Sequence, residues 1–433
     1  MLTGRSRVIV GLVTVVSMVA ASCGGTATSR DPAGDVVRID RVFEKVFARI
    51  ARDSLGTTRA SRIYANVSLA MLATQAPVDQ GAAELLAKVD GFPEMKVPSR
   101  FDADIATVAA AASVARNLLP SASDRANFAQ FRDSSIAEMS RDTDRETVAS
   151  SLSFAKRVSA AVMVRASNDG SDNADSPLPG SSAVSTGGWV PTPPSLLPAI
   201  DPGWGAIRRF MKGTEKCVPA APPVGLDPKS PYEEAAAFVK EMSVDLTDLQ
   251  KTVARFWNDE GRGSGTTTGH WVNISLAVSA KKNRSVARTV TAAAGVAMAS
   301  ADAITAAWSS KYAWAVERPV TVIQRTDPSW QPYLETPATP GYPSARAAAS
   351  RAAADILTHY LGETVFGDPG RGLTVRERSA QGIKTQYFES FRAAADQTAL
   401  SRLYAGTDYR MSVRAGERLG GCVALKVTTG LAG

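Results

Sequence analysis

Residues 284–314 read RSVARTVTAAAGVAMASADAITAAWSSKYAW, a run of small and apolar side chains that contains no proline. Such a run predicts one long helix, because nothing in it breaks the 3.6-residue period. Small side chains also let neighbouring helices approach closely, which is typical of a helix in the middle of a bundle. The preceding run 271–282, WVNISLAVSAKK, has a similar character. These two segments favour a tightly packed helical core.

The rest of the chain continues this helical pattern. Alanine-rich stretches dominate and strand-like alternation is scarce, which predicts an all-α fold, a helical bundle. With 433 residues, of which 44% are hydrophobic, the chain can bury a large core. We expect an N-terminal helical half at 36–168, a connector rich in Pro, Gly and Ser at 169–205, and a C-terminal helical half at 206–433. The closing helices are expected at 344–361, within 375–396 and near 413–427.

The N-terminus has the features of an export signal. Arg5 and Arg7 precede an apolar run that ends in Ala-Ala-Ser before Cys23. This pattern resembles a bacterial lipoprotein signal: residues 1–22 would be removed, Cys23 would carry the lipid, and 23–35 would be a flexible tether. The chain would then be exported and lipid-anchored on the outer face of the cell membrane. The alternatives are a plain secreted protein and a cytoplasmic protein with an apolar start.

The charge balance gives no indication of a nucleic-acid partner. The whole chain has 49 basic and 42 acidic residues, a net charge of +7. Without the two arginines of the signal segment, 47 basic residues remain against the same 42 acidic ones, which leaves +5. No basic stripe is interleaved with aromatic residues, so we expect no nucleic acid.

Three cysteines are present, and two of them lie in the helical part of the chain. If Cys23 is acylated, Cys217 and Cys422 remain as a pair that an oxidising compartment allows to form a disulfide. Pairing cannot be deduced from sequence, so two separate thiols stay an alternative.

Three short stretches carry the residues of an oxyanion site. Lys311 and Arg318 are seven residues apart, nearly two helical turns, and are expected on one helix face. Ser344 is placed as an N-cap, which leaves free N–H groups that an anion can meet. Arg402 adds another cation, and Arg346 lies in the first turn after Ser344. Each element alone is weak, because a cation at a helix end commonly just complements the helix dipole.

In this order and spacing the three stretches resemble the vanadium-dependent haloperoxidase and type 2 phosphatidic acid phosphatase (PAP2) superfamily, in its soluble bacterial haloperoxidase branch. The signature of that superfamily is K-x6-R-P, then P-S-G-H, then S-R-x5-H-x3-D. Here Lys311 and Arg318 match the first element, Ser344 half of the second, and Arg402 the start of the third. The resemblance covers about residues 35–430. It implies an all-helical bundle in which these four residues bind an oxyanion.

The chain departs from the signature at both histidines. Arg346 stands where the family has its proton-transfer histidine, and Asp408 stands where a histidine bonds to vanadium or phosphorus. Glu317 takes a place that is commonly Trp in the haloperoxidases. The two histidines of the chain are His270, which is interpreted as a structural residue remote from the signature, and His359, which is too far along its helix to replace the lost ones.

These departures point away from halogenation. Arginine stays protonated, so Arg346 cannot act as a base or a ligand. Asp408 can in principle attack phosphorus, or it can pair with Arg346 and neutralise the surplus cations. We therefore expect an Arg346–Asp408 pair, no cofactor, and no tight vanadate binding.

Several functions remain open. One is a non-redox isomerase or cyclase acting on a small prenylated or phosphorylated metabolite, with Glu317, Asp408 and Arg346 as catalytic groups. Another is a non-catalytic anion-binding or scaffold lipoprotein. The third is an active haloperoxidase or acid phosphatase with unusual ligands. The expected partners are a small molecule or phosphate-type anion and, through the lipid, the membrane; relatives often dimerise, so a homodimer stays open.

Overall fold

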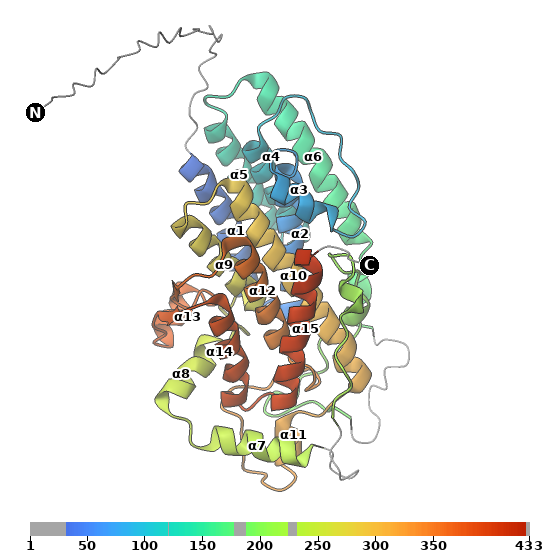
Figure 1. Ribbon diagram of the computed structural model, residues 1–433, viewed down its shortest axis with the longest axis vertical. Coiled ribbons are helices and arrows are strands. Elements are labelled where there is room, and N and C mark those ends of the chain that lie inside the picture. The colour runs from blue at the N-terminus through green and yellow to red at the C-terminus, as the bar shows by residue number, and fades with distance from the viewer. Residues whose placement is uncertain (1–31, 120, 177–187, 224–231, 430–433) are drawn as a thin grey trace, which may run out of the picture. The chain divides into compact units, whose positions relative to one another are not determined.

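The computed structural model describes residues 32–119, 121–176, 188–223 and 232–429, and these are mostly helical (Figure 1). The predicted all-α class is therefore confirmed. The predicted signal peptide, Cys23, most of the tether and part of the connector lie outside the described residues.

The first half of the chain folds into six helices. Side-chain caps define several starts: Asp102, Ser121 and Asp144 each accept a hydrogen bond from a backbone N–H in the first turn that follows. The helices are α1 Pro32–Asp53, α2 Thr57–Gln75, α3 Gln80–Ala87, α4 Ala103–Leu118, α5 Ala122–Met139 and α6 Arg145–Ser167.

The second half begins with three 3₁₀ turns and continues as a further set of helices. The turns are η1 Ser171–Asn173, η2 Trp204–Ala206 and η3 Thr214–Lys216. The helices are α7 Glu233–Val244, α8 Asp248–Phe256, α9 Thr266–Lys281, α10 Val286–Trp314, α11 Pro319–Ile323, α12 Ala345–Leu361, α13 Val375–Ala380, α14 Phe391–Tyr404 and α15 Arg410–Thr429. Two short antiparallel strands, β1 Phe366–Asp368 and β2 Gln386–Phe388, lie between α12 and α14.

Helix α10 is the centre of the bundle, as its composition predicts. It contacts α2, α9, α12 and α15, and nearly all of its side chains are buried. Within the described residues, the stretch Val286–Ile323 is long and apolar enough to cross a membrane, but its most apolar window is entirely buried inside the protein. It is therefore a core helix here.

Glycines let α15 approach α12 closely. A Cβ on Gly416 would collide with the carbonyl oxygen of Ser344, and one on Gly420 would collide with that of Ala348. The two glycines are four residues apart, so they lie on one face of α15. This close approach holds the start of α12, which carries Ser344, against α15.

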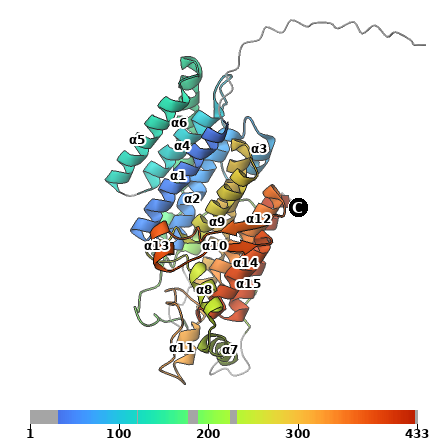
Figure 2. The same ribbon diagram turned by 90° about the vertical axis from the view of Figure 1, so that its left-hand side faces the viewer.

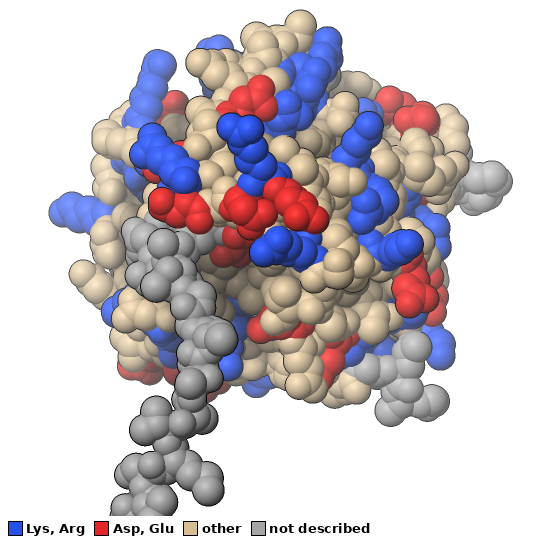
Figure 3. Space-filling model, turned by 90° about the horizontal axis from the view of Figure 1, so that it is seen from above, with Lys and Arg blue, Asp and Glu red and all other residues tan. Residues whose placement is uncertain are grey.

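Some helices of the two halves lie at opposite ends of the bundle, while α1 and α2 pack against α9 and α10 between them. In Figures 1 and 2, α7 and α11 lie at one end, while α3 to α6 lie toward the other. Figure 3 shows the molecule from above, and basic and acidic side chains are interspersed on that face. That face presents no large field of one sign.

Two details of the sequence prediction are wrong. The region 375–396 holds two helices, α13 and the start of α14, with β2 between them. Helix α10 ends at Trp314, and Ala315 adopts a left-handed conformation, so Lys311 and Arg318 do not share a helix face. Arg318 is instead the N-cap of α11. The sequence pattern did not indicate this break, because the helix ends at an alanine in a left-handed conformation and no glycine or proline lies between Trp314 and Pro319.

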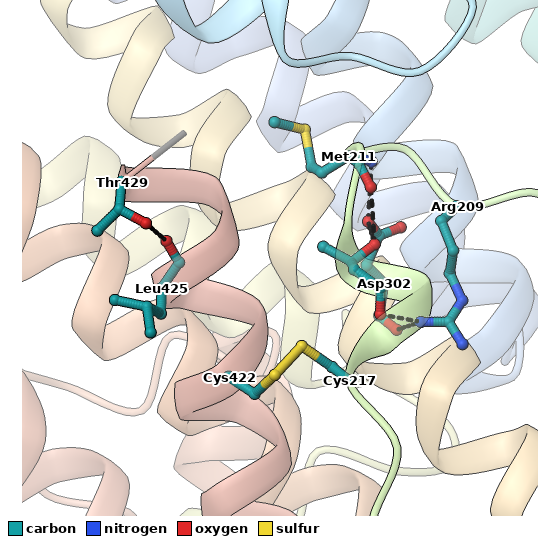
Figure 4. The surroundings of a disulfide bond; sticks show 8 residues. Arg209, Met211, Cys217, Asp302, Cys422, Leu425 and Thr429 are labelled. Atoms are coloured by element: carbon teal, nitrogen blue, oxygen red, sulfur yellow. Dashed lines mark hydrogen bonds between the residues drawn. A yellow bond between two sulfur atoms is a disulfide. The ribbon is translucent and has the colours of Figure 1, made fainter. Parts of the chain in front are cut away.

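The two remaining cysteines form a disulfide, which decides between the alternatives left open by the sequence. Cys217, just after η3, is bonded to Cys422 on α15, 205 residues away (Figure 4). The loop before Cys217 is fixed to α10 by Asp302, whose carboxylate accepts hydrogen bonds from the N–H groups of Phe210 and Met211. The disulfide and this buried carboxylate together join the segment 210–217, α10 and α15.

Candidate anion-binding site

A cavity of about 400 Å³ brings the residues of the three motifs together. It has the volume of a small-molecule site. Six of the seven expected site residues line it, and five of these come from the ends of α10, α11, α12 and α14, which meet here although they are distant in sequence. The expected residues that line the cavity are Lys311, Arg318, Ser344, Arg346, Arg402 and, after α14, Asp408.

Two cations are held by backbone carbonyls. Lys311 is buried, and its Nζ donates to the carbonyl oxygen of Pro340 at 2.5 Å. Arg318 is also buried, and its Nε donates to Thr339 O at 2.6 Å. Burial, reinforced by the neighbouring Arg318 guanidinium, holds the pKa of Lys311 well below its usual value. The amine is therefore easily deprotonated when no anion is near.

Asp408 lies between two arginines. Its Oδ1 accepts from Arg318 at 2.7 Å and its Oδ2 accepts from Nε of Arg402 at 3.0 Å. Burial alone would raise the pKa of Asp408, but the charges of Arg318 and Arg402 lower it to about 2. The carboxylate is thus ionised and fixed, which makes it a poor base. Among the described residues the terminal nitrogens of Arg402 have no hydrogen-bond partner, so they are free to meet a ligand.

Arg346 does not pair with Asp408, so that prediction is wrong. Its guanidinium donates to the carbonyl oxygen of Trp257 and to Oε1 of Glu260, both at 2.6 Å. These partners follow α8, about 86 residues before Arg346. The cation in the first turn of α12 is therefore compensated by an acid and a carbonyl from another segment, not by the other substituted position.

The start of α12 faces the cavity with unused donors. Ser344 is the N-cap, as predicted, but its hydroxyl makes no capping hydrogen bond and has no other partner among the described residues. The first bond of the helix runs from the N–H of Ala348 to Ser344 O, so the N–H groups of Ala345 and Arg346 precede it. These groups carry the partial positive charge of the helix N-terminus.

Glu317 is not part of this cavity. It is buried, and its Oε1 accepts from Arg325 at 2.5 Å, on the side where Tyr232 and Tyr409 pack. Of the two carboxylates proposed as an acid and base pair, the structure brings only Asp408 to the site.

His270 forms a buried ionic cluster next to the cavity wall. Its Nδ1 lies 2.9 Å from Asp259 and its Nε2 lies 2.7 Å from Asp368. Burial alone would lower the pKa of His270, but the two carboxylates raise it to about 10. Asp259 lines the cavity and precedes Glu260, so this imidazolium fixes the segment that holds Arg346. Its structural role is as expected, but the sequence did not reveal its position or the acids around it.

The other side of the cavity is apolar. Its mouth and wall include Leu55, Leu197, Ile200, Trp308 and Ala349. Leu197 and Ile200 are partly exposed, at 50% and 37%. A ligand with a charged end and an apolar body matches this division, because each part would meet its own kind of surface.

Comparisons with known proteins agree with this fold. Residues 291–431 match the family model described as the VCPO second helical-bundle domain. The crystal structure of a bacterial vanadium-dependent iodoperoxidase is similar with a TM-score of 0.77 and 26% identity, over 90% of this chain and 96% of the other. Two bacterial vanadium-dependent chloroperoxidase structures, holo and apo, are similar in fold, with TM-scores of 0.59 and 0.60 at 17% and 16% identity, over 86% of this chain and 93% and 96% of theirs.

None of the curated proteins matches the chain in sequence. The family model and the solved structures nevertheless support the vanadium haloperoxidase/PAP2 superfamily, in agreement with the resemblance seen in the motifs.

The donor set of this cavity does not fit the vanadate of that superfamily. Covalent attachment of vanadate there uses an imidazole nitrogen, and neither histidine of this chain lines the cavity. The position of the bonding histidine is held by Asp408, whose two oxygens are occupied by Arg318 and Arg402. The hydrogen-bond donors for an oxyanion are present, but the covalent ligand is not.

Proposed function

We propose that this chain binds a small organic anion in the 400 Å³ cavity and does not carry out vanadate-dependent halogenation. The observation that carries the proposal is that the cavity has more hydrogen-bond donors than its own acceptors use, and that no histidine lines it. Each acid that lines the cavity already has a partner: Asp408 has two arginines, Glu260 has Arg346, Asp259 has His270, and Glu335 accepts from the Ser195 hydroxyl. The terminal nitrogens of Arg402, the Ser344 hydroxyl and the first N–H groups of α12 remain for an oxyanion such as phosphate or sulfate.

The direct test is calorimetric titration with phosphate and with vanadate. We expect wild type to bind phosphate, and Arg402→Gln and Ser344→Ala to weaken that binding, because each removes an unused donor. Arg208→Gln is the matched control, since Arg208 forms a surface pair with Asp90. If wild type bound vanadate tightly and brominated a phenol with peroxide, the proposal would be wrong.

A double reversion gives an independent arm of this test. Arg346→His with Asp408→His restores both imidazoles of the signature in a cavity that keeps Lys311, Arg318 and Arg402. We expect this variant to gain affinity for vanadate relative to wild type. An unchanged affinity would mean that the lost histidines do not explain the missing chemistry.

A non-redox isomerase or cyclase is the second candidate, and one observation favours it. Lys311 lines the cavity, and burial lowers the pKa of its amine, so it gives up its proton more readily than an ordinary lysine and is suited to act there as a base. Dihydroxyacetone phosphate is a suitable probe, because it joins a phosphate to carbon-bound protons beside a ketone. Exchange of those protons with D₂O, followed by proton NMR and abolished by Lys311→Met, would support this candidate. Exchange at the rate of the buffer alone would contradict it.

We also propose that the chain is exported and anchored through a lipid on Cys23. The disulfide between Cys217 and Cys422 supports this, because structural disulfides persist in oxidising compartments. Expression in a bacterium with a labelled fatty acid should give a labelled protein in the membrane fraction. Cys23→Ser should lose the label and the membrane association; a soluble, unlabelled wild type would leave plain secretion as the explanation.

A further inference from the structure

Helices α9 and α12 run parallel, and both begin at the cavity. Ser300 on α10 donates to Ala349 O on α12, and Gly295 on α10 faces Ile356, so α10 and α12 are antiparallel. Helix α9 is joined to α10 by a short turn and packs against it, so it is antiparallel to α10 as well. Two helices that are each antiparallel to α10 are parallel to one another.

A direct contact fixes the register of these two helices. Nε1 of Trp271 on α9 donates to the Ser350 hydroxyl on α12 at 2.9 Å. One turn earlier on each helix lie Thr267 and Arg346, and both line the cavity. The positive ends of two helix dipoles therefore meet the same cavity side by side.

A buried polar side chain, Thr267, lines the cavity at the start of α9. It is only 1% exposed, it lines the cavity, and its hydroxyl has no hydrogen-bond partner among the described residues. The hydroxyls of Thr266 and Thr268 also lack partners, but they are completely buried. The Thr267 hydroxyl is not completely buried. A buried hydroxyl without a protein partner normally meets a water or a ligand. The N-cap of α9 is Gly265, which has no side chain; the Ser264 hydroxyl accepts from the Thr266 N–H at 3.0 Å, so the N–H groups from Thr267 onward remain at this helix start.

The backbone here is held in an unusual conformation. Thr266 has a φ of 65°, which is rare for a β-branched residue, and Gly265 is packed so closely on Phe47 that it has no room for a Cβ. The packing thus turns the chain sharply into α9 directly at the cavity wall. The carboxylates nearby are compensated: Asp259 by His270, and Glu260 by Arg346.

From this geometry we infer a second subsite for an acceptor group, formed by the Thr267 hydroxyl and the N–H groups of α9 that follow Thr266, beside the oxyanion subsite at Ser344 and Arg402. The ligand is then an organic anion with two oxygen-bearing groups, such as a phosphorylated or sulfated carboxylic acid. This inference rests on the proposed function, because the first group must bind at the Lys and Arg side of the cavity.

Two phosphonates of similar shape distinguish one subsite from two. 3-Phosphonopropionate carries a carboxylate where propylphosphonate carries a methyl group. On the full-length protein we expect calorimetry to give 3-phosphonopropionate about tenfold tighter binding, the effect of one charge-assisted hydrogen bond. Thr267→Val should remove that advantage while leaving propylphosphonate binding unchanged, and Thr267→Ser should keep it. Thr268→Val is the matched control, because Thr268 is buried but does not line the cavity.

The outcomes separate the two proposals. Equal binding of both phosphonates by wild type would overturn the second subsite and leave the proposed function standing. Tighter binding of the carboxylate that survives Thr267→Val would overturn its location at α9. If neither phosphonate bound, the proposed function would fail and the inference would fail with it. The comparison of the two ligands on wild type needs no variant, so it holds even if Thr267→Val does not fold.

Discussion

Asp408→Asn removes one charge from the centre of the cavity and leaves the shape of the side chain almost unchanged. Asn is close in shape to a protonated Asp, so the substitution imitates acidification at a single residue. In wild type, Asp408 is 3% exposed and is bonded to both Arg318 and Arg402. In the variant the two guanidinium groups face each other across a neutral amide, with Lys311 beside them.

The expected loss of stability follows from the pKa of this carboxyl. A folded-state pKa of about 2 against an ordinary 3.8 corresponds to roughly 2 kcal/mol at 1.36 kcal/mol per pKa unit. Removing one partner of a buried ion pair costs roughly 3–5 kcal/mol. We therefore expect the free energy of unfolding at pH 7 to fall by about 2–5 kcal/mol. Because the folded pKa is depressed, this contribution is present above pH 3.8 and is lost in wild type as the pH falls toward 2.

Urea unfolding with and without phosphate tests both parts of this reasoning. The variant should unfold at lower urea, and phosphate should stabilise it more than wild type, since the cavity has gained a positive charge. A bound anion at 100 times its Kd adds about 2.7 kcal/mol. Asp90→Asn, which breaks an exposed pair with Arg208, is the control and should cost under about 1 kcal/mol. A loss for Asp408→Asn as small as that of the control, or no effect of phosphate, would refute the reasoning.

Three further perturbations probe the supports of the cavity. Cys217→Ser removes the disulfide to Cys422, which closes a loop of 205 residues. The free energy of unfolding, measured in urea under non-reducing conditions, should fall by up to about 5 kcal/mol. Reduction of the wild-type disulfide should cause the same loss. The pKa of His270 is raised to about 10, so its stabilisation is complete below pH 6.5 and is lost as the pH rises to 10; the free energy of unfolding should fall over that range in wild type and not in His270→Gln. Glu260→Gln removes the carboxylate that pairs with the Arg346 guanidinium, so calorimetry should show phosphate binding about tenfold more tightly. Unchanged binding would mean that Arg346 does not face the ligand.

The helical framework could be predicted because it depends on local patterns. The alanine-rich run of α10 gave a long core helix, and Ser344 gave the start of α12. The spacing of Lys311, Arg318 and Arg402 identified the superfamily, and the superfamily in turn placed these cations at one site. The fold brings these cations together, so no single stretch of sequence could predict that they would meet. That prediction came only from the resemblance to the superfamily.

The partners of those cations could not be predicted in the same way. Glu260 meets Arg346, and Asp259 meets His270, because the segment after α8 folds back between α9 and α12. This segment has no period that fixes which side chain points inward. One signal was present: two acids, then glycines, then the threonines before His270, which together indicate a tight turn into a helix start with charged neighbours.

Arg346 and Asp408, which replace the two histidines of the signature, have separate charged partners and do not pair with each other. This changes which ligands the cavity can recognise. If Arg346 and Asp408 had paired, they would have closed the site between them. Instead Asp408 neutralises charge within the cavity wall, between Arg318 and Arg402, and Arg346 is bonded to Glu260. The formal charges of the polar wall are thus nearly balanced, while hydrogen-bond donors remain in excess. Recognition here depends on the positions of those donors more than on net charge, which favours a ligand selected by geometry over any small anion.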